Sequence, residues 1–134
     1  MNAREKLLEI RNALKRAEML RESQNRLRDS VTRITGSYSG MPRGSSQDDR
    51  MLSYAARLYE LDKQIDEMLS VHLEARREAL EAVNRLEDIR QQQVIVYRYF
   101  DLMSWHKIAR KMHYSVQHAF RLHAEALRAL DELM

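Results

Sequence analysis

The sequence contains no cysteine, only one proline and only three glycines. Without cysteine, the chain has no disulfide bonds and no thiolate metal ligands, which fits a reducing compartment. So few glycines and prolines provide few turns, and this favours a small number of long helices. No apolar run approaches the roughly 20 residues of a membrane-spanning helix, and the first ten residues are charged rather than signal-like. We therefore expect a cytoplasmic protein with no membrane partner.

The residues that are present point to helices as well. Hydrophobic residues make up 44% of the 134 positions, which is enough for a core. Charged residues make up 32%, which is above the usual quarter and favours exposed helices over a thick globule. The composition therefore predicts an all-α fold.

The glycines and the proline all lie between Thr35 and Ser46, so residues 35–48 form the predicted main connection. Before it, Asn2 to Ile34 is predicted to be one helix, with Asn2 as its N-cap. After it, Asp48 or Asp49 can cap a second helix.

The second helix has apolar residues at alternating three- and four-residue steps, which is a heptad pattern. Its members are Met51, Tyr54, Leu58, Leu61, Ile65, Met68, His72, Ala75, Ala79, Ala82 and Leu86. Because the two predicted helices are of similar length, we expect residues 1–86 to form a long N-terminal antiparallel helical hairpin, a coiled coil.

Two helices bury only one stripe each, so such a hairpin is marginal by itself. The seam also ends in small residues, which either allow close backbone approach or leave space for a partner chain. We therefore expect a homo-oligomer. The predicted oligomerisation residues are Leu58, Leu61, Ile65, Met68, His72, Ala75 and Ala79.

A new helix is predicted from Ile89 to about Phe100, because Asp88 and Gln91 form a capping pair at its start. The run 94–97 is rich in residues that favour strands, so an isolated strand is the alternative. The helix is preferred because no other strand is available to pair with it.

Two further helices follow, each preceded by a serine that can cap it. Ser104 precedes Trp105 to Met112, and Ser115 precedes Val116 to about Leu133. The junction between them is short, and His113 stands where glycine is frequent because φ there can be positive; histidine tolerates that region. Residues 87–134 are therefore predicted to be a three-helix domain with a helix-turn-helix.

The charge of this domain is uneven. Residues 102–124 contain no acidic residue but four basic ones and four of the five histidines. A local positive face indicates a polyanionic partner, although a chance gap in acidic residues is an equal alternative.

A helix-turn-helix of this kind predicts specific contacts to double-stranded DNA. Gln117 can bind adenine and Arg121 guanine, while Phe120 either contacts a thymine methyl or packs on the preceding helix. The predicted base-reading residues are Ser115, Val116, Gln117, His118, Phe120 and Arg121. The predicted backbone contacts are Lys107, Arg110, Lys111 and Tyr114.

No catalytic residue, cofactor or metal site is predicted. Gly40 and Gly44 lack the Gly-Lys-Ser/Thr that completes a phosphate-binding loop. Carboxylate pairs on the second helix are accounted for by a solvated charged face. The histidines lack the spacing of four that metal-binding pairs have on one helix. We therefore expect a protein that is not an enzyme.

Two segments of the C-terminal domain, Arg90–Tyr99 and Met103–Ala109, resemble region 4 of bacterial sigma factors. The similarity covers about residues 87–130. The similarity implies a three-helix DNA-binding unit. It also implies host RNA polymerase as a second partner that this unit could bind. The chain has no room for the promoter-melting region 2, so the resemblance does not imply a complete sigma factor.

The chain as a whole resembles small prophage proteins of Gram-positive bacteria, of the ArpU and RinA type. The similar segments are Ser39–Gly44, Met112–Ser115 and Arg121–Leu127. The resemblance implies a phage or prophage transcriptional regulator that activates late genes beside host RNA polymerase, associated with the nucleoid of the bacterial host. The alternative is an adaptor that binds RNA polymerase or a phage packaging component, similar to a small terminase subunit.

Overall fold

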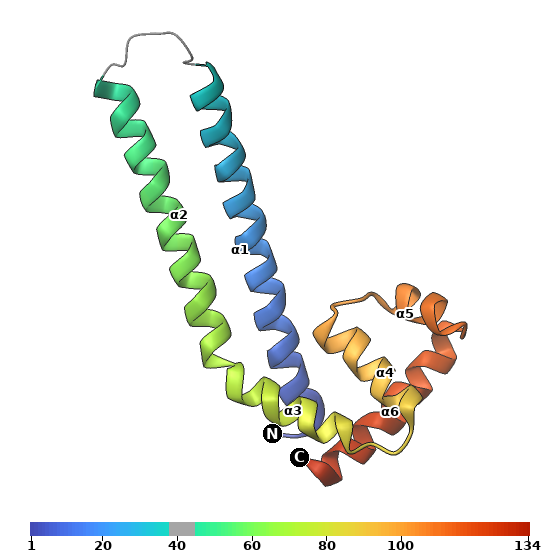
Figure 1. The fold of residues 1–134 in the computed structure, drawn as a ribbon. Helices are drawn as coiled ribbons and strands as arrows, with labels where there is room; N and C mark the ends of the chain where they lie inside the picture. The colour runs from blue at the N-terminus through green and yellow to red at the C-terminus, as the bar shows by residue number, and fades with distance from the viewer. Residues whose placement is uncertain (38–44) are drawn as a thin grey trace. The chain divides into compact units, whose positions relative to one another are not determined.

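A computed structural model describes the backbone of residues 1–37 and 45–134, and the side chains of 1–33 and 49–134. Within these ranges all regular structure is helical and no strand occurs, which confirms the predicted all-α class. The helices are α1 (Ala3–Ser37), α2 (Ser45–Val71), α3 (Leu73–Asn84), α4 (Ile89–Ile95), the π-helix η1 (Val96–Phe100), α5 (Trp105–Met112) and α6 (Val116–Leu133) (Figure 1). None of these helices combines the length and the apolar character needed to cross a membrane.

The chain divides into two compact units. The terminal unit contains Met1–Lys15 and Ser70–Met134, and the helix-pair unit contains Arg16–Leu69. The predicted boundary between residues 86 and 87 therefore does not separate compact units. The reason is that Leu7 and Ile10, at the start of α1, are buried in one cluster with residues of α4 and α6.

The terminal unit has a closed apolar core, whose members come from α1, α3, α4, η1, α5 and α6. The start of α1 is held in this unit by apolar contacts and by a hydrogen bond. In this bond Ala3 N–H donates to Asp131 Oδ1 of α6 at 2.8 Å. The largest side chains with less than 2% exposure that lie in this core are Leu7, Ile10, Val83, Val94, Ile95, Ile108 and Leu130.

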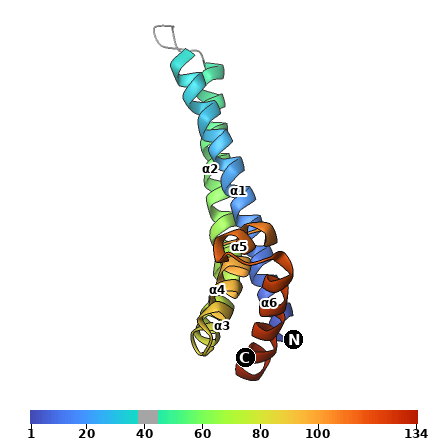
Figure 2. The ribbon, with the colours of Figure 1, turned by 90° about the vertical axis from the view of Figure 1, so that its right-hand side faces the viewer.

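The helix-pair unit consists of α1 from Arg16 onward and of α2 up to Leu69, which run side by side in opposite directions (Figures 1 and 2). Few of its described side chains are buried; Ala17, Gln24 and Ile65 are. The Gln24 side-chain amide donates to the Asp62 carboxylate of α2. Gln24 occupies the seam position between Leu20 and Leu27 that the apolar pattern skips. A polar residue at such a position fixes the register of two helices.

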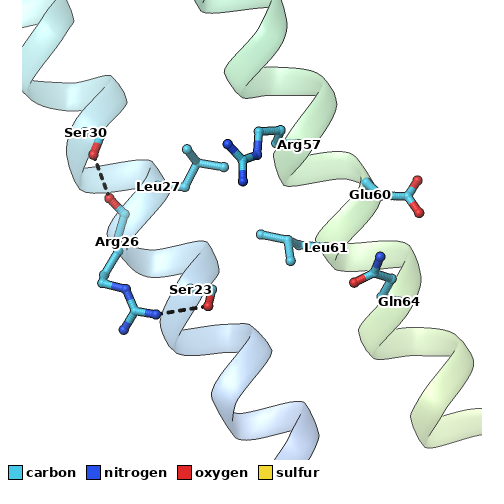
Figure 3. A pocket seen from close by; sticks show the side chains of 8 residues that line it. All are labelled: Ser23, Arg26, Leu27, Ser30, Arg57, Glu60, Leu61 and Gln64. Carbon is cyan, nitrogen blue, oxygen red and sulfur yellow. Dashed lines mark hydrogen bonds between the residues drawn. The ribbon is translucent and has the colours of Figure 1, made fainter.

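Between α1 and α2 the helix-pair unit has an open groove of about 480 Å³. Leu27 and Leu61 point into it from the two helices. Arg57 also points from α2 toward Leu27, whereas Glu60 points away from α1 (Figure 3). The groove is open to solvent, and the two leucines that point into it are only half-buried.

The start of α1 is capped as the sequence predicted, but the end of α1 and the start of α2 differ from the prediction. Asn2 Oδ1 accepts from Glu5 N–H at 2.9 Å, which confirms the predicted cap. The helix α2 begins at Ser45, so the prediction that Asp48 or Asp49 caps it was wrong. The predicted connection 35–48 is shorter than expected, because α1 extends to Ser37. Residues 45–48 belong to α2, and residues 38–44, which include the Ser39–Gly44 segment, lie outside the described residues.

The predicted heptad seam is interrupted at His72. This residue is a turn between α2 and α3 and caps α3, with Arg76 N–H donating to its carbonyl at 2.9 Å. Beyond the turn, Ala79 is fully buried in the core of the terminal unit, whereas Ala75 is exposed. A continuous seam through these residues was therefore a wrong prediction. Ala79 and Ala82 are covered by residues of the same chain, so these two small residues give no reason for a second chain.

Candidate nucleic-acid interface

The segment that leads into the candidate site starts as predicted. Asp88 caps α4, and its Oδ1 accepts from Arg90 N–H at 2.9 Å. The chain stays helical to Phe100, which confirms the preferred alternative for this segment, but its second half is a π-helix. At the end of this π-helix, Asp101 N–H donates a hydrogen bond to the Val96 carbonyl at 2.9 Å. Leu102 then adopts a φ of 60°, a left-handed conformation that the sequence did not predict.

Helix α5 lies with one face in the core and one in solvent. Ser104 caps it as predicted, and its Oγ accepts from Lys107 N–H at 3.2 Å. Ile108 and Ala109 are buried, which fixes which way the helix faces. The predicted backbone-contact residues Lys107, Arg110 and Lys111 are all exposed.

The turn after α5 has the predicted left-handed residue. His113 has φ 60° and ψ 40°, and the next N–H, of Tyr114, donates to the Ala109 carbonyl at 2.9 Å. Ser115 then caps α6, and its Oγ accepts from His118 N–H at 3.0 Å. The short junction and both serine caps are therefore confirmed.

Helix α6 buries Ala119, Leu122 and Ala126 in the core, on the face that the sequence predicted. Its opposite face carries most of the predicted base-reading residues. Ser115, Gln117, Phe120 and Arg121 are exposed, and Val116, His118 and the neighbouring Tyr114 are half-buried. The first two turns of α6 thus present hydrogen-bonding and aromatic groups to solvent.

Several of these side chains are held by neighbours. Tyr114 and His118 stack with ring centroids 4.2 Å apart and an angle of 15°. Lys111 Nζ lies 4.8 Å from the centre of the Tyr97 ring. Such contacts reduce the rotamer freedom that a long side chain loses on binding a ligand. Side chains on both sides of the turn between α5 and α6 are therefore partly preorganised.

Phe120 packs on the preceding helix and still lies partly in solvent, so its contact with a thymine methyl stays a prediction. Its ring meets the edge of Trp105 at a centroid distance of 4.8 Å, so it packs on the preceding helix. It nevertheless remains 45% exposed. Trp105 is in turn covered by the Arg98 guanidinium, 4.8 Å from the centre of its ring. The Phe120 ring thus packs on Trp105, which itself makes a cation–π contact with Arg98.

A polar cluster that sequence reasoning missed lies beneath this surface. His123 Nε2 and Tyr99 Oη are 2.6 Å apart, and the His123 ring also contacts Trp105 edge-on at 4.8 Å. Burial, with the charges of Arg4 and Arg98, lowers the pKa of His123 to about 4. His123 is therefore neutral at pH 7 and does not contribute to the positive face. Its spacing of four from Ala119 and three from Ala126, both buried, was a signal that it lies beside the core face.

The cluster reaches into the N-terminal helix. Arg11 is 9% exposed and its Nε donates to the Arg98 carbonyl at 2.9 Å. Arg98 Nη1 donates to the Met103 carbonyl at 3.1 Å. Burial and then the nearby Arg11 charge lower the pKa of Arg98. Two arginines thus tie α1 to the segment before α5, a link that nothing in the sequence pattern indicated.

Of the comparisons with known proteins, only the one with protein families gives a match. No curated protein and no solved structure matches the chain. The sequence model of the family described as "Protein of unknown function (DUF722)" matches residues 10–132, which is most of the chain and includes α3 to α5 in full. The chain therefore belongs to this family.

Proposed function

We propose that α5 and α6 form a sigma region 4-like helix-turn-helix that binds double-stranded DNA sequence-specifically. The observation that carries this proposal is the first two turns of α6. They begin at a serine cap after a left-handed turn, and they expose Gln117, Phe120 and Arg121 together. Glutamine and arginine recognise adenine and guanine in the major groove, which admits a helix of this size.

Three exposed cations on α5 support the proposal. Lys107, Arg110 and Lys111 precede the turn, and none of them is paired with a carboxylate among the described residues. Unpaired cations beside a reading helix suit phosphate contacts, which set affinity and register but carry no sequence information. The N–H groups at the start of α6 add a site for a phosphate.

The resemblance to prophage regulators supplies the biological side of the proposal. The protein acts as a phage or prophage transcriptional regulator and activates late genes beside host RNA polymerase. The alternative is an adaptor whose C-terminal unit binds polymerase or a packaging component. The exposed aromatic edge of Phe120 favours this alternative, because exposed aromatics are enriched at protein interfaces.

The test is selection of fragments from the parent genome by the full-length protein, followed by gel-shift titration of a selected fragment and of random DNA at two salt concentrations. Arg121→Ala should weaken binding to the selected fragment roughly 5- to 150-fold and to random DNA much less. Arg128→Ala is the matched control, because Arg128 is also exposed on α6 but lies two turns further on. It should leave binding nearly unchanged.

Arg110→Ala separates phosphate contacts from base reading. It should weaken binding to both DNAs equally and reduce the salt slope by about one. If no genomic fragment is retained above random sequence, or if Arg121→Ala and Arg128→Ala behave alike, base reading by α6 is wrong. Retention of RNA polymerase without retention of DNA would favour the adaptor.

A further inference from the structure

Helix α2 carries a second apolar face that the predicted seam does not include. Leu52 and Tyr59 are 69% and 71% exposed. Ala55 and Ala56 lie between them and are also exposed. With about 100° between successive residues, positions 52, 55, 56 and 59 lie on one side of a helix. We call these four residues the back face of α2.

The back face is not the face that packs on α1. The seam residues Tyr54, Leu58 and Leu61 are half-buried and Ile65 is 5% exposed, because α1 covers them. By the same helical geometry, the back face points about 150° away from this seam. Two large apolar side chains on the far side of a thin helix pair are more than scattered surface residues, because they form one patch.

The back face is complementary to itself. Its centre is the pair of small residues Ala55 and Ala56, which lets a second helix approach closely. In a second copy that runs antiparallel, Leu52 lies opposite Tyr59 and Tyr59 lies opposite Leu52. This exchange is the signature of a two-fold, isologous interface, in which one patch meets its own copy.

The charges at the edge of the back face show the same symmetry. Asp49 and Lys63 lie seven residues before and after Ala56, on the same side of the helix. Both are exposed, and neither has an ion-pair partner in the part of the chain that the structure describes. In the antiparallel pairing that places Leu52 opposite the partner's Tyr59, the two-fold axis passes between Ala55 and Ala56. Lys63 then lies within one residue's rise of the partner subunit's Asp49, twice in each dimer. Opposite charges at matching heights favour this pairing over a parallel one.

We propose that two copies of the chain associate through the back faces of α2, antiparallel, with Leu52 packed on the partner subunit's Tyr59. The surface differs from the predicted oligomerisation seam, part of which is occupied by α1 and part of which lies in the terminal unit. The association needs no DNA. It would join two reading helices in one particle, which raises avidity for a site with two halves.

The first experiment measures the mass of the full-length protein by sedimentation velocity and light scattering at tens of micromolar, without DNA. The wild type should have twice the chain mass of 16.0 kDa. The double variant Leu52→Asp/Tyr59→Asp should have the chain mass. Met19→Asp is the matched control, because Met19 is 65% exposed on α1 of the same unit. It should remain a dimer.

The second experiment tests the orientation by charge reversal. Asp49→Lys and Lys63→Asp should each weaken the dimer about three- to fivefold, since exposed ion pairs contribute little. The double reversal should restore it, because both pairs are re-formed with opposite sign. These variants keep the apolar face, so they remain informative if the double aspartate variant loses helicity in circular dichroism.

A wild-type monomer at these concentrations would overturn the proposal. So would a dimer that Met19→Asp dissociates as completely as the double aspartate variant, or a double reversal that is weaker than both single variants. Since the mass is measured without DNA, this proposal and the proposed function can fail independently.

Discussion

The two units of the chain are both helical but differ in how much they bury. The terminal unit encloses large side chains at no exposure, among them Leu7, Ile95 and Leu130. The helix-pair unit has an open groove between its helices, and its buried residues include a glutamine. Buried apolar area stabilises a fold at about 25 cal/mol per Å². The terminal unit therefore contains most of the stability, and the helix-pair unit is the part that gains most from a partner.

The difference also shows that a single helix can belong to both kinds of structure. Helix α1 is uninterrupted from Ala3 to Ser37, yet its part up to Lys15 belongs to the unit with the closed core and its later part to the helix pair. The same substitution at two places on α1 should therefore have two different costs.

The largest expected effect comes from this contrast. Leu7→Ala should lower the free energy of unfolding by about 3 kcal/mol, because a fully buried leucine leaves a cavity. Leu20→Ala, in the same helix but half-buried, should lower it by about 1 kcal/mol. Urea unfolding followed by circular dichroism measures both, at a protein concentration below the range of self-association. Equal losses at the two positions would contradict the division into units.

The sequence predicted local features of this fold better than long-range ones. The caps at Asn2, Asp88, Ser104 and Ser115 and the left-handed His113 were all predictable, because each depends on a few neighbouring residues. The start of α1 in the terminal core was not predictable. It depends on contacts between residues more than a hundred positions apart, such as Ala3 and Asp131.

The break at His72 shows a different limit. Its surroundings contain no glycine or proline, and the apolar spacing continues without interruption to Leu86. The spacing is preserved on both sides of the turn, but Ile65 is buried in one unit and Ala79 in the other. Periodicity reports that a residue is buried and not what buries it. For the candidate site, the pattern likewise identified the exposed face of α6 but not the cluster of Tyr99, Trp105 and His123 beneath it.

The second largest effect concerns this cluster and acidic pH. His123 has a pKa of about 4 in the folded chain and about 6.5 when unfolded. Between these values the unfolded state binds the extra proton, so stability is full above pH 6.5 and falls as the pH approaches 4. From pH 7 to pH 5 the wild type should lose about 1 to 2 kcal/mol from this residue.

His123→Gln should remove this part of the pH dependence, because glutamine does not titrate but can still hydrogen-bond Tyr99. The measurement is urea unfolding at pH 7 and pH 5 for both proteins. In hydrogen exchange, the loss of protection of the wild type at pH 5 should be confined to amides of the terminal unit. This result would sharpen the contrast between the two units. A variant that loses as much stability as the wild type would show that His123 is not the cause.

A smaller effect is expected in the helix-pair unit. Asp62→Ala removes the acceptor of the buried Gln24 amide, and an unpaired buried donor is costly. The open packing lets water replace part of the lost bond, so the expected loss is about 1 kcal/mol. Hydrogen exchange should accelerate in α1 and α2 around Gln24 and remain unchanged in α6. Asp66→Ala, at an exposed position one turn further on, is the control. If both variants accelerate exchange equally, the Gln24–Asp62 hydrogen bond does not fix the register of the two helices.

The smallest expected effect tests whether the turn at His113 holds backbone strain. His113 adopts φ 60°, a conformation that costs non-glycine residues energy, and its side chain is exposed. His113→Gly should therefore raise the free energy of unfolding by about 0.5 kcal/mol, whereas the β-branched His113→Val should lower it by about 1 kcal/mol. Both values come from thermal and urea unfolding. If the two variants have the same stability, the turn has relaxed, and the terminal unit is less rigid than its buried core implies.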